Sequence, residues 1–173
     1  MKRLGLSAPR ALFFLIALLF LSACGPSSDR DVVAKEPVFV PEGELRFERP
    51  DGSLIARIAV ELAETETEQA TGLMGRRSLP ALGGMLFVND SPRMQQFWMK
   101  NTPLPLDIIF IRDDLTITNI VARTQPLSEA FIESTDEAQY VLEVRAGFTE
   151  AYGIGEDTVI RWQRLQDTAA APG

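Results

Sequence analysis

The alternation of apolar residues with a period of two is the feature that most constrains how this chain can fold. Residues 54–62 have apolar side chains at every even position, as expected of a strand with one buried face. Residues 115–121 and 140–145 alternate in the same way, apart from Asn119, which breaks the pattern, whereas residues 108–111 (IIFI) are apolar on both faces and predict a central strand. Further segments have strand-like composition: 44–49, 84–88, 95–100 and 158–164. About seven or eight short strands predict a mainly β (α+β) fold, as a small barrel-like or strongly curved antiparallel sheet.

Local signals add one or two short helices and a hairpin. Thr65 and Glu68 have the spacing of a capping box, which predicts a helix that ends near residue 76 or 77. A second short helix is expected at 149–152, where the glycines that follow stop it. The Asp-Gly pair at 51–52 lies between two predicted strands and indicates a hairpin turn.

The N-terminal segment has the three parts of a secretory signal. Its start is basic, with Lys2, Arg3 and Arg10 and no acid, residues 11–21 are wholly apolar, and small residues precede Cys24. The tetrad LSAC that ends at Cys24 resembles the lipobox of bacterial lipoproteins, which implies cleavage before this cysteine and acylation of its sulfur. The apolar run is about half of the roughly 20 residues that span a bilayer. An uncleaved membrane anchor and a plain signal peptide are the alternatives.

These features predict a lipoprotein with four parts. They are a signal peptide (1–23), a flexible tether (24–43), a mainly β domain (44–166) and a disordered tail (167–173). Acyl chains on Cys24 are expected to anchor the protein to a membrane of the bacterial cell envelope, facing the periplasm. Gly25, not aspartate, follows the cysteine. By resemblance to enteric bacteria, this favours the outer membrane over the inner one.

Composition excludes several kinds of chemistry. With no histidine and one cysteine, the chain cannot form a Ser-His-Asp triad, a histidine-ligated zinc site or an internal disulfide. Removal of the three basic residues of the signal takes the net charge from −7 to −10, so we expect no nucleic-acid partner. Besides Lys35 in the tether, Lys100 is the one lysine beyond the signal. Any general acid or base is therefore Asp, Glu, Tyr or Lys100.

Three segments carry a resemblance to a known family: 72–79 (GLMGRRSL), 84–88 (GMLFV) and 97–110 (FWMKNTPLPLDIIF). Together with YVLEVRAG at 140–147, they closely resemble the bacterial and archaeal family called domain of unknown function 192, over about residues 54–162. The resemblance implies a compact, mainly β, barrel-like domain that is often exported, and it implies no established activity. The sequence departs from the family pattern at two turns, Asn89-Asp90 and 155–157.

The motif at 97–110 contains the candidate binding residues. Side chains alternate along a strand, so burial of Phe97 and Met99 would turn their neighbours outward or into a cleft. The chain then turns and returns, which is expected to bring Asp107 near Lys100. We expect a non-enzymatic site for a small polar ligand or an envelope protein, with no cofactor and no metal. Its residues would be Trp98, Lys100, Asn101 and Asp107, completed by Arg76 and Glu143.

Three other interpretations are open. In a purely structural one, Lys100 and Asp107 form a salt bridge across a hairpin, which contributes at most about 1 kcal/mol if exposed, and Asn101 is a turn residue. In an enzymatic one, Asp107 and Lys100 act as acid and base on an envelope substrate, which requires a buried lysine. In the third, thioethers bind Cu(I), although methionine is also a common core residue. The methionines concerned are Met74, Met85, Met94 and Met99.

Overall fold

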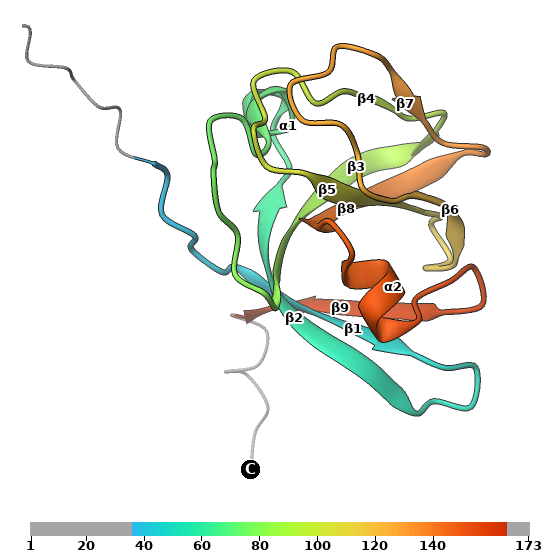
Figure 1. Ribbon diagram of the computed structural model, residues 1–173. Helices are drawn as coiled ribbons and strands as arrows, with labels where there is room; N and C mark the ends of the chain where they lie inside the picture. Colours follow the sequence, from blue (N-terminus) through green and yellow to red (C-terminus); the bar gives the residue numbers. More distant parts are fainter. Residues whose placement is uncertain (1–35, 166–173) are drawn as a thin grey trace, which may run out of the picture. The chain divides into compact units, whose positions relative to one another are not determined.

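The computed structural model describes residues 36–165, which form a seven-stranded mixed sheet and a two-stranded sheet (Figure 1). The order in the large sheet is β6-β5-β8-β3-β2-β1-β9, and β4 pairs with β7. The strands are β1 (Gly43–Glu48), β2 (Leu54–Ala63), β3 (Gly83–Arg93), β4 (Gln96–Phe97), β5 (Leu106–Ile111), β6 (Ile117–Val121), β7 (Ile132–Glu133), β8 (Ala138–Arg145) and β9 (Val159–Arg164). The helices are α1 (Glu66–Thr71) and α2 (Phe148–Tyr152). The mainly β prediction is confirmed, whereas the predicted signal peptide, Cys24 and the whole predicted tail lie outside the described residues.

One strand pair departs from the antiparallel arrangement expected from the sequence. β2 and β3 run parallel, with Leu62 opposite Leu86, and the other pairs of the large sheet are antiparallel. Residues 64–82, which include α1, form the long connection that parallel neighbours require. The sheet curves until Thr116, just before β6, forms a bridge with Val159 of β9. In the described part of the chain it does not close into a barrel.

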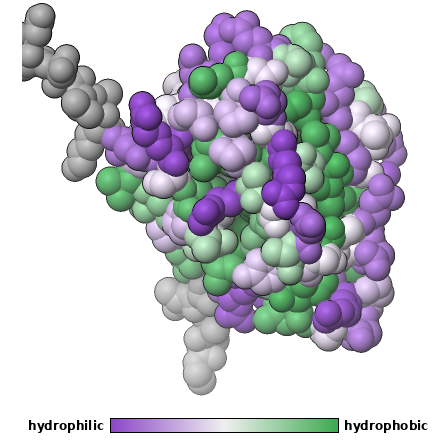
Figure 2. Space-filling model, in the orientation of Figure 1, coloured by the Kyte–Doolittle hydropathy of each residue, from purple (hydrophilic) through white to green (hydrophobic). Residues whose placement is uncertain are grey.

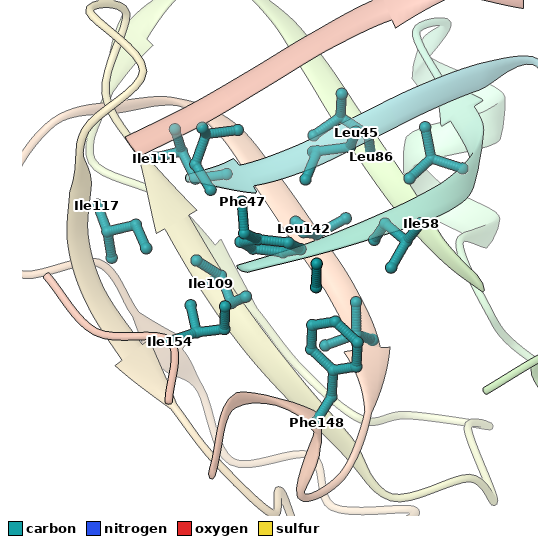
Figure 3. Packing of buried hydrophobic residues seen from close by; sticks show 14 of the residues in the cluster. Leu45, Phe47, Ile58, Leu86, Ile109, Ile111, Ile117, Leu142, Phe148 and Ile154 are labelled. Carbon is teal, nitrogen blue, oxygen red and sulfur yellow. The ribbon is translucent and has the colours of Figure 1, made fainter. Parts of the chain in front are cut away.

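The inner face of the curved sheet carries the larger hydrophobic core (Figure 3). Strands contribute alternate residues to it, as the period of two requires; examples are Leu45, Ile58, Leu86, Ile109 and Leu142. Each such fully buried side chain contributes about 1.5–3 kcal/mol. Helix α2 covers this face, because its first residue, Phe148, packs against Phe47 with ring centroids 5.5 Å apart. The predicted stop of this helix is confirmed at Gly153, which has a left-handed φ of 64°.

The outer face of the central strands is buried as well. Alternate residues of β3, β5 and β8, among them Phe87, Ile108 and Val141, pack there against Leu73 and Met99 from the connecting segments. Every residue of β5 is therefore buried, as predicted for a strand that is apolar on both faces.

Helix α1 begins where the capping box predicts it. The hydroxyl of Thr65 accepts a hydrogen bond from the Glu68 N–H, and the Glu68 carboxylate accepts one from the Thr65 N–H. The helix ends at Gly72, however, several residues before the expected position near residue 76. Gly72 has a φ of 46°, which reverses the chain and lets Leu73 enter the outer core.

Residues 36–42, expected to belong to the tether, contact the domain. The carboxylate of Glu36 accepts hydrogen bonds of 2.8 Å from the N–H groups of Arg77 and Ser78, and these bonds lower the pKa of Glu36. Phe39 packs against the outer core. Among the residues described, no helix is long and apolar enough to cross a membrane.

A Gly84→Ala substitution tests how closely β3 and β8 approach each other. A Cβ at this position would lie 2.8 Å from the backbone oxygen of Glu143 and 3.1 Å from a methyl group of Val144, so the strands would have to move apart. We expect the free energy of unfolding to fall by about 1–3 kcal/mol, measured by urea denaturation. Gly155→Ala is the matched control, because its Cβ would meet only the side chain of Asp157. Equal losses in the two variants would contradict the close approach.

Candidate functional site

The six candidate residues of the sequence hypothesis lie in three different environments. Between β5 and β8, Asp107 is opposite Val144 and Ile108 is opposite Glu143. Paired residues share a face of a sheet and consecutive residues do not, so Asp107 points to the inner face and Glu143 to the outer face. Arg76 lies in the connection between α1 and β3. The turn that follows β4 holds the remaining three: Trp98, Lys100 and Asn101.

Asp107 is a buried structural residue and has other partners than Lys100, contrary to the sequence hypothesis. One carboxylate oxygen accepts hydrogen bonds from the N–H groups of Arg123 and Gly147, at 2.8 and 3.0 Å. The other accepts from the N–H and the hydroxyl of Thr149, at 2.9 and 2.7 Å. These bonds tie β5 to the first turn of α2, whose N-cap is a glycine without a capping side chain. The hypothesis failed because Asp107 lies on the strand position that faces inward.

Two acids on the outer face flank a methionine. Met85 of β3 pairs with Glu61 of β2 and with Glu143 of β8. One oxygen of Glu61 accepts a hydrogen bond from the Val40 N–H at 2.9 Å, and the other lies 2.7 Å from the guanidinium of Arg76 as an ion pair. Arg76 and Glu143 thus belong to the same face, as the cleft hypothesis required, but the ionic partner of Arg76 is Glu61, which sequence reasoning missed.

Glu143 is buried, and none of the ion pairs found within residues 36–165 includes it. Its side chain is 4% exposed, and its Oε2 has no hydrogen-bond partner among the described residues. Burial disfavours the charged form and raises the pKa of Glu143 to about 8. At pH 7 the carboxyl is therefore mostly neutral, so it can donate a hydrogen bond but cannot balance a cation.

The segment after β4 is a turn, although a strand was expected over 95–100. Asn101 has a left-handed φ of 55°, which supports its interpretation as a turn residue. The expected alternation of side chains nevertheless holds: Met99 is fully buried, whereas Trp98 and the side chain of Lys100 are about 40% exposed.

Trp98, Lys100, Glu129 and Phe131 form an exposed group that we call the aromatic platform. The rings of Trp98 and Phe131 are stacked, with an interplanar angle of 13° and centroids 6.2 Å apart. The Lys100 ammonium lies 5.0 Å from the centroid of the Trp98 ring and 3.6 Å from the Glu129 carboxylate. At exposed sites each of these two contacts contributes about 1 kcal/mol or less. They orient the lysine and leave both rings open to solvent.

Two backbone hydrogen bonds join the loops that carry the platform. The Met99 N–H donates to the Ser128 oxygen at 2.9 Å, and the Leu127 N–H donates to the Thr102 oxygen at 3.1 Å. Leu127 has a φ of 60°, a strained conformation for a residue with a Cβ, and its side chain is 61% exposed. The loops are thus held in one arrangement while apolar side chains remain outside.

Sequence reasoning missed Phe131 as a functional candidate, and it considered Glu129 only as one of several carboxylates and not as the partner of Lys100. They lie in a polar stretch with no periodicity, and the one available signal was an isolated aromatic residue in that stretch. Exposure alone would not single them out, because hydrophobic residues reach the surface in several areas of the face shown in Figure 2. The stacking of two rings under a lysine distinguishes the platform.

The methionines lie in different environments. Met85 and Met99 belong to the outer core, and the sulfur of Met99 accepts a hydrogen bond from the Thr124 hydroxyl at 3.2 Å. Met94 is instead 59% exposed. Core packing is therefore the interpretation favoured for Met85 and Met99. Across residues 36–165, no group of three or more His, Cys, Asp or Glu side chains is placed to hold a metal ion.

Comparisons with known proteins agree with the sequence motifs. The family model DUF192, described as an uncharacterized ACR (COG1430), matches residues 47–162. A crystal structure from Sinorhizobium meliloti 1021, whose description proposes a transcription regulator, has a TM-score of 0.68 and 36% identity, covering 73% of this chain and 97% of that chain. A protein of unknown function from Novosphingobium aromaticivorans DSM 12444 has a TM-score of 0.65 and 35% identity, covering 69% and 84% of the two chains. No curated protein matches this chain.

Glu143→Gln is expected to stabilise the protein in a pH-dependent way. The folded state keeps the proton of Glu143 up to about pH 8, whereas the unfolded state releases it near pH 4.5, so stability is lost as pH rises between these values. The neutral amide removes this loss. The variant should be more stable than the parent by roughly 3 kcal/mol at pH 7 and almost equal to it at pH 4.5, measured by urea denaturation at both values.

Glu156→Gln is the control for this experiment, because Glu156 is exposed, and it should leave the pH dependence unchanged. A Glu143→Gln variant that is equally or less stable than the parent at pH 7 would show that the buried carboxyl is charged and paired.

Proposed function

This chain belongs to the DUF192 family, and we propose that it is a membrane-anchored envelope lipoprotein whose domain binds a partner protein through the aromatic platform. The family is uncharacterised, so the proposal depends on the site. The observation that carries it is the exposed stack of Trp98 and Phe131 beneath Lys100.

The composition of the platform is that of the energetic centre of a protein interface. Tryptophan dominates binding hot spots, and aromatic residues and methionine are enriched in interfaces generally. Leu127 and Met94 lie on the two segments that carry the rings, and both are more than half exposed. The Lys100–Glu129 ion pair lies beside the rings, and the attraction between its two charges becomes stronger once a partner excludes water. An ordered apolar surface beside an ion pair matches the surface of a protein partner better than it matches a small polar ligand.

Catalysis by Asp107 and Lys100 has no support in this geometry. The carboxylate of Asp107 is occupied by hydrogen bonds on the inner face, while Lys100 is about 40% exposed and paired with Glu129. Neither group is placed to exchange a proton with the other. We also do not extend the description of the Sinorhizobium protein as a transcription regulator to this chain, because a net charge of −7 repels nucleic acid.

The proposed location depends on the N-terminal sequence. The basic start, the apolar run and the LSAC tetrad support export and acylation of Cys24. The lipid would anchor the domain to the periplasmic side of a membrane, with Gly25 favouring the outer membrane. Loops on an anchored domain would then meet other envelope proteins without diffusing away.

Replacement of Cys24 tests the anchor. Cells that produce the chain and are fed a labelled fatty acid should incorporate the label into the parent protein, and Cys24→Ser should abolish incorporation because no other thiol exists. The readout is the labelled band and the mass of the mature N-terminal peptide. Ser22→Thr is the control that keeps Cys24 in place. An unacylated, uncut parent chain would refute the location.

Photocrosslinking tests the platform. A photoreactive phenylalanine analogue at Phe131 of the full chain, irradiated in its native bacterium, should give one discrete adduct whose partner mass spectrometry identifies. Trp98→Ala in the same chain should reduce this adduct about tenfold or more, since hot-spot truncations cost about 2 kcal/mol or more. The same analogue at Leu54, another exposed apolar residue, should not give it. Equal adducts at both positions, or an adduct insensitive to Trp98→Ala, would contradict the proposal.

A further inference from the structure

A pocket of about 150 Å³ lies where β3 leaves its regular pairing with β8. The register shifts between Val88, which pairs with Tyr140, and Arg93, which pairs with Ala138. The extra residues of β3 begin at Asn89, one of the two places where the sequence departs from the family pattern. The pocket is lined by Gln69, Phe87, Asn89, Arg93, Gln95, Gln96 and Phe97.

Asn89 fixes the backbone geometry at the register shift between β3 and β8. Its side-chain amide donates to the backbone oxygen of Gln139 at 2.9 Å, and the side-chain amide of Gln139 donates to the backbone oxygen of Asn89 at 3.1 Å. The side-chain oxygen of Asn89 accepts a hydrogen bond from the Arg93 guanidinium at 2.7 Å. Arg93 is thereby held at the pocket through one of its nitrogens.

The pocket offers one positive charge and one free acceptor. Within residues 36–165, no carboxylate lies within ion-pair distance of Arg93, and its Nε and Nη1 have no hydrogen-bond acceptor. Gln95 is 96% buried and donates its amide to the Ala138 oxygen at 2.8 Å. No donor in the described part of the chain reaches its side-chain oxygen.

The opposite side of the pocket is apolar and rigid. The rings of Phe87 and Phe97 meet edge to face, with centroids 4.9 Å apart and an interplanar angle of 88°. Gln69 of α1 is fixed by donating to the Val88 oxygen at 3.0 Å. A volume of about 150 Å³ is the size that accommodates a benzene-sized group. The ligand is therefore small, or it is the end of a larger molecule.

We infer that this pocket binds an apolar amino-acid residue with a free carboxylate, either as a free acylated amino acid or as the C-terminus of a peptide. The carboxylate meets the planar fork of Arg93, which matches its two oxygens. The adjacent N–H donates to the oxygen of Gln95, and the apolar side chain lies against the ring of Phe97, because Phe87 behind it is only 2% exposed. The carboxylate, the N–H and the apolar side chain of the ligand thus match the cation, the acceptor and the aromatic surface of the pocket.

This inference does not depend on the aromatic platform. Of the residues that line the pocket, none belongs to the platform. Loss of partner binding at Trp98 would leave the pocket intact, and loss of ligand binding at Arg93 would leave the platform intact.

NMR titration of the ¹⁵N-labelled full chain in detergent micelles tests the pocket. N-acetyl-leucine should shift the side-chain amide signals of Gln95 and Asn89 in a saturable way. N-acetyl-leucinamide, which lacks the carboxylate, should bind at least about tenfold more weakly, since a charge-assisted pair contributes about 1.5–3 kcal/mol. Arg93→Gln should weaken N-acetyl-leucine to a similar degree. Arg145→Gln is the matched control, because Arg145 is also exposed and lies away from the pocket.

The tripeptide Ala-Ala-Leu distinguishes the two sources of the ligand. Tighter binding than that of N-acetyl-leucine identifies a peptide C-terminus, and equal or weaker binding identifies a free acylated amino acid. The inference is overturned if neither compound shifts the pocket signals, if the amide binds as well as the acid, or if Arg93→Gln has no effect in a variant whose remaining spectrum is unchanged.

Discussion

Burial of both faces of β5 and β8 is the constraint on which the rest of the structure depends. The inner face packs beneath α2, and the outer face packs beneath the connecting segments, so a polar side chain in the fully buried part of either strand is cut off from water. Asp107 meets this constraint with hydrogen bonds from the start of α2, whereas Glu143 meets it by retaining its proton. Because the chain has one cysteine, no internal disulfide stabilises the fold, and stability comes from packing.

Of the two proposed binding surfaces, the platform lies on loops at the β4–β7 side of this sheet (Figure 1), and the pocket is lined mainly by residues of α1, β3 and β4. The platform occupies the turn after β4 and the segment before β7, and the pocket lies beside the irregular end of β3. Loops supported by a rigid sheet commonly carry function, since they vary without disturbing the core. Here backbone hydrogen bonds between Met99 and Ser128 and between Leu127 and Thr102 order the loops in advance, which lowers the entropy lost on binding.

The predictions that succeeded depend on neighbouring residues. The capping box at Thr65, the turn at Gly52 and the helix stop at Gly153 each involve a few consecutive positions, and each is confirmed. The alternation within β2 and the apolar run of β5 likewise identified strands and their buried faces. Two expectations failed for a different reason. The direction of β3 relative to β2 depends on the route of a long connection, and the strand expected over 95–100 ends early because its backbone bonds to a distant loop instead.

The sequence by itself determined the fold class, the family, the absence of histidine and disulfide chemistry, and the residues that alternate between core and surface. Composition and periodicity depend only on which residues the chain has and on the order of near neighbours, so both can be obtained from the sequence without the structure. The tertiary structure alone decided which side chains meet: Asp107 with Thr149, Arg76 with Glu61, and Trp98 with Phe131. Such pairs come from distant segments, and their contacts follow from strand order and loop packing, which no short-range pattern encodes.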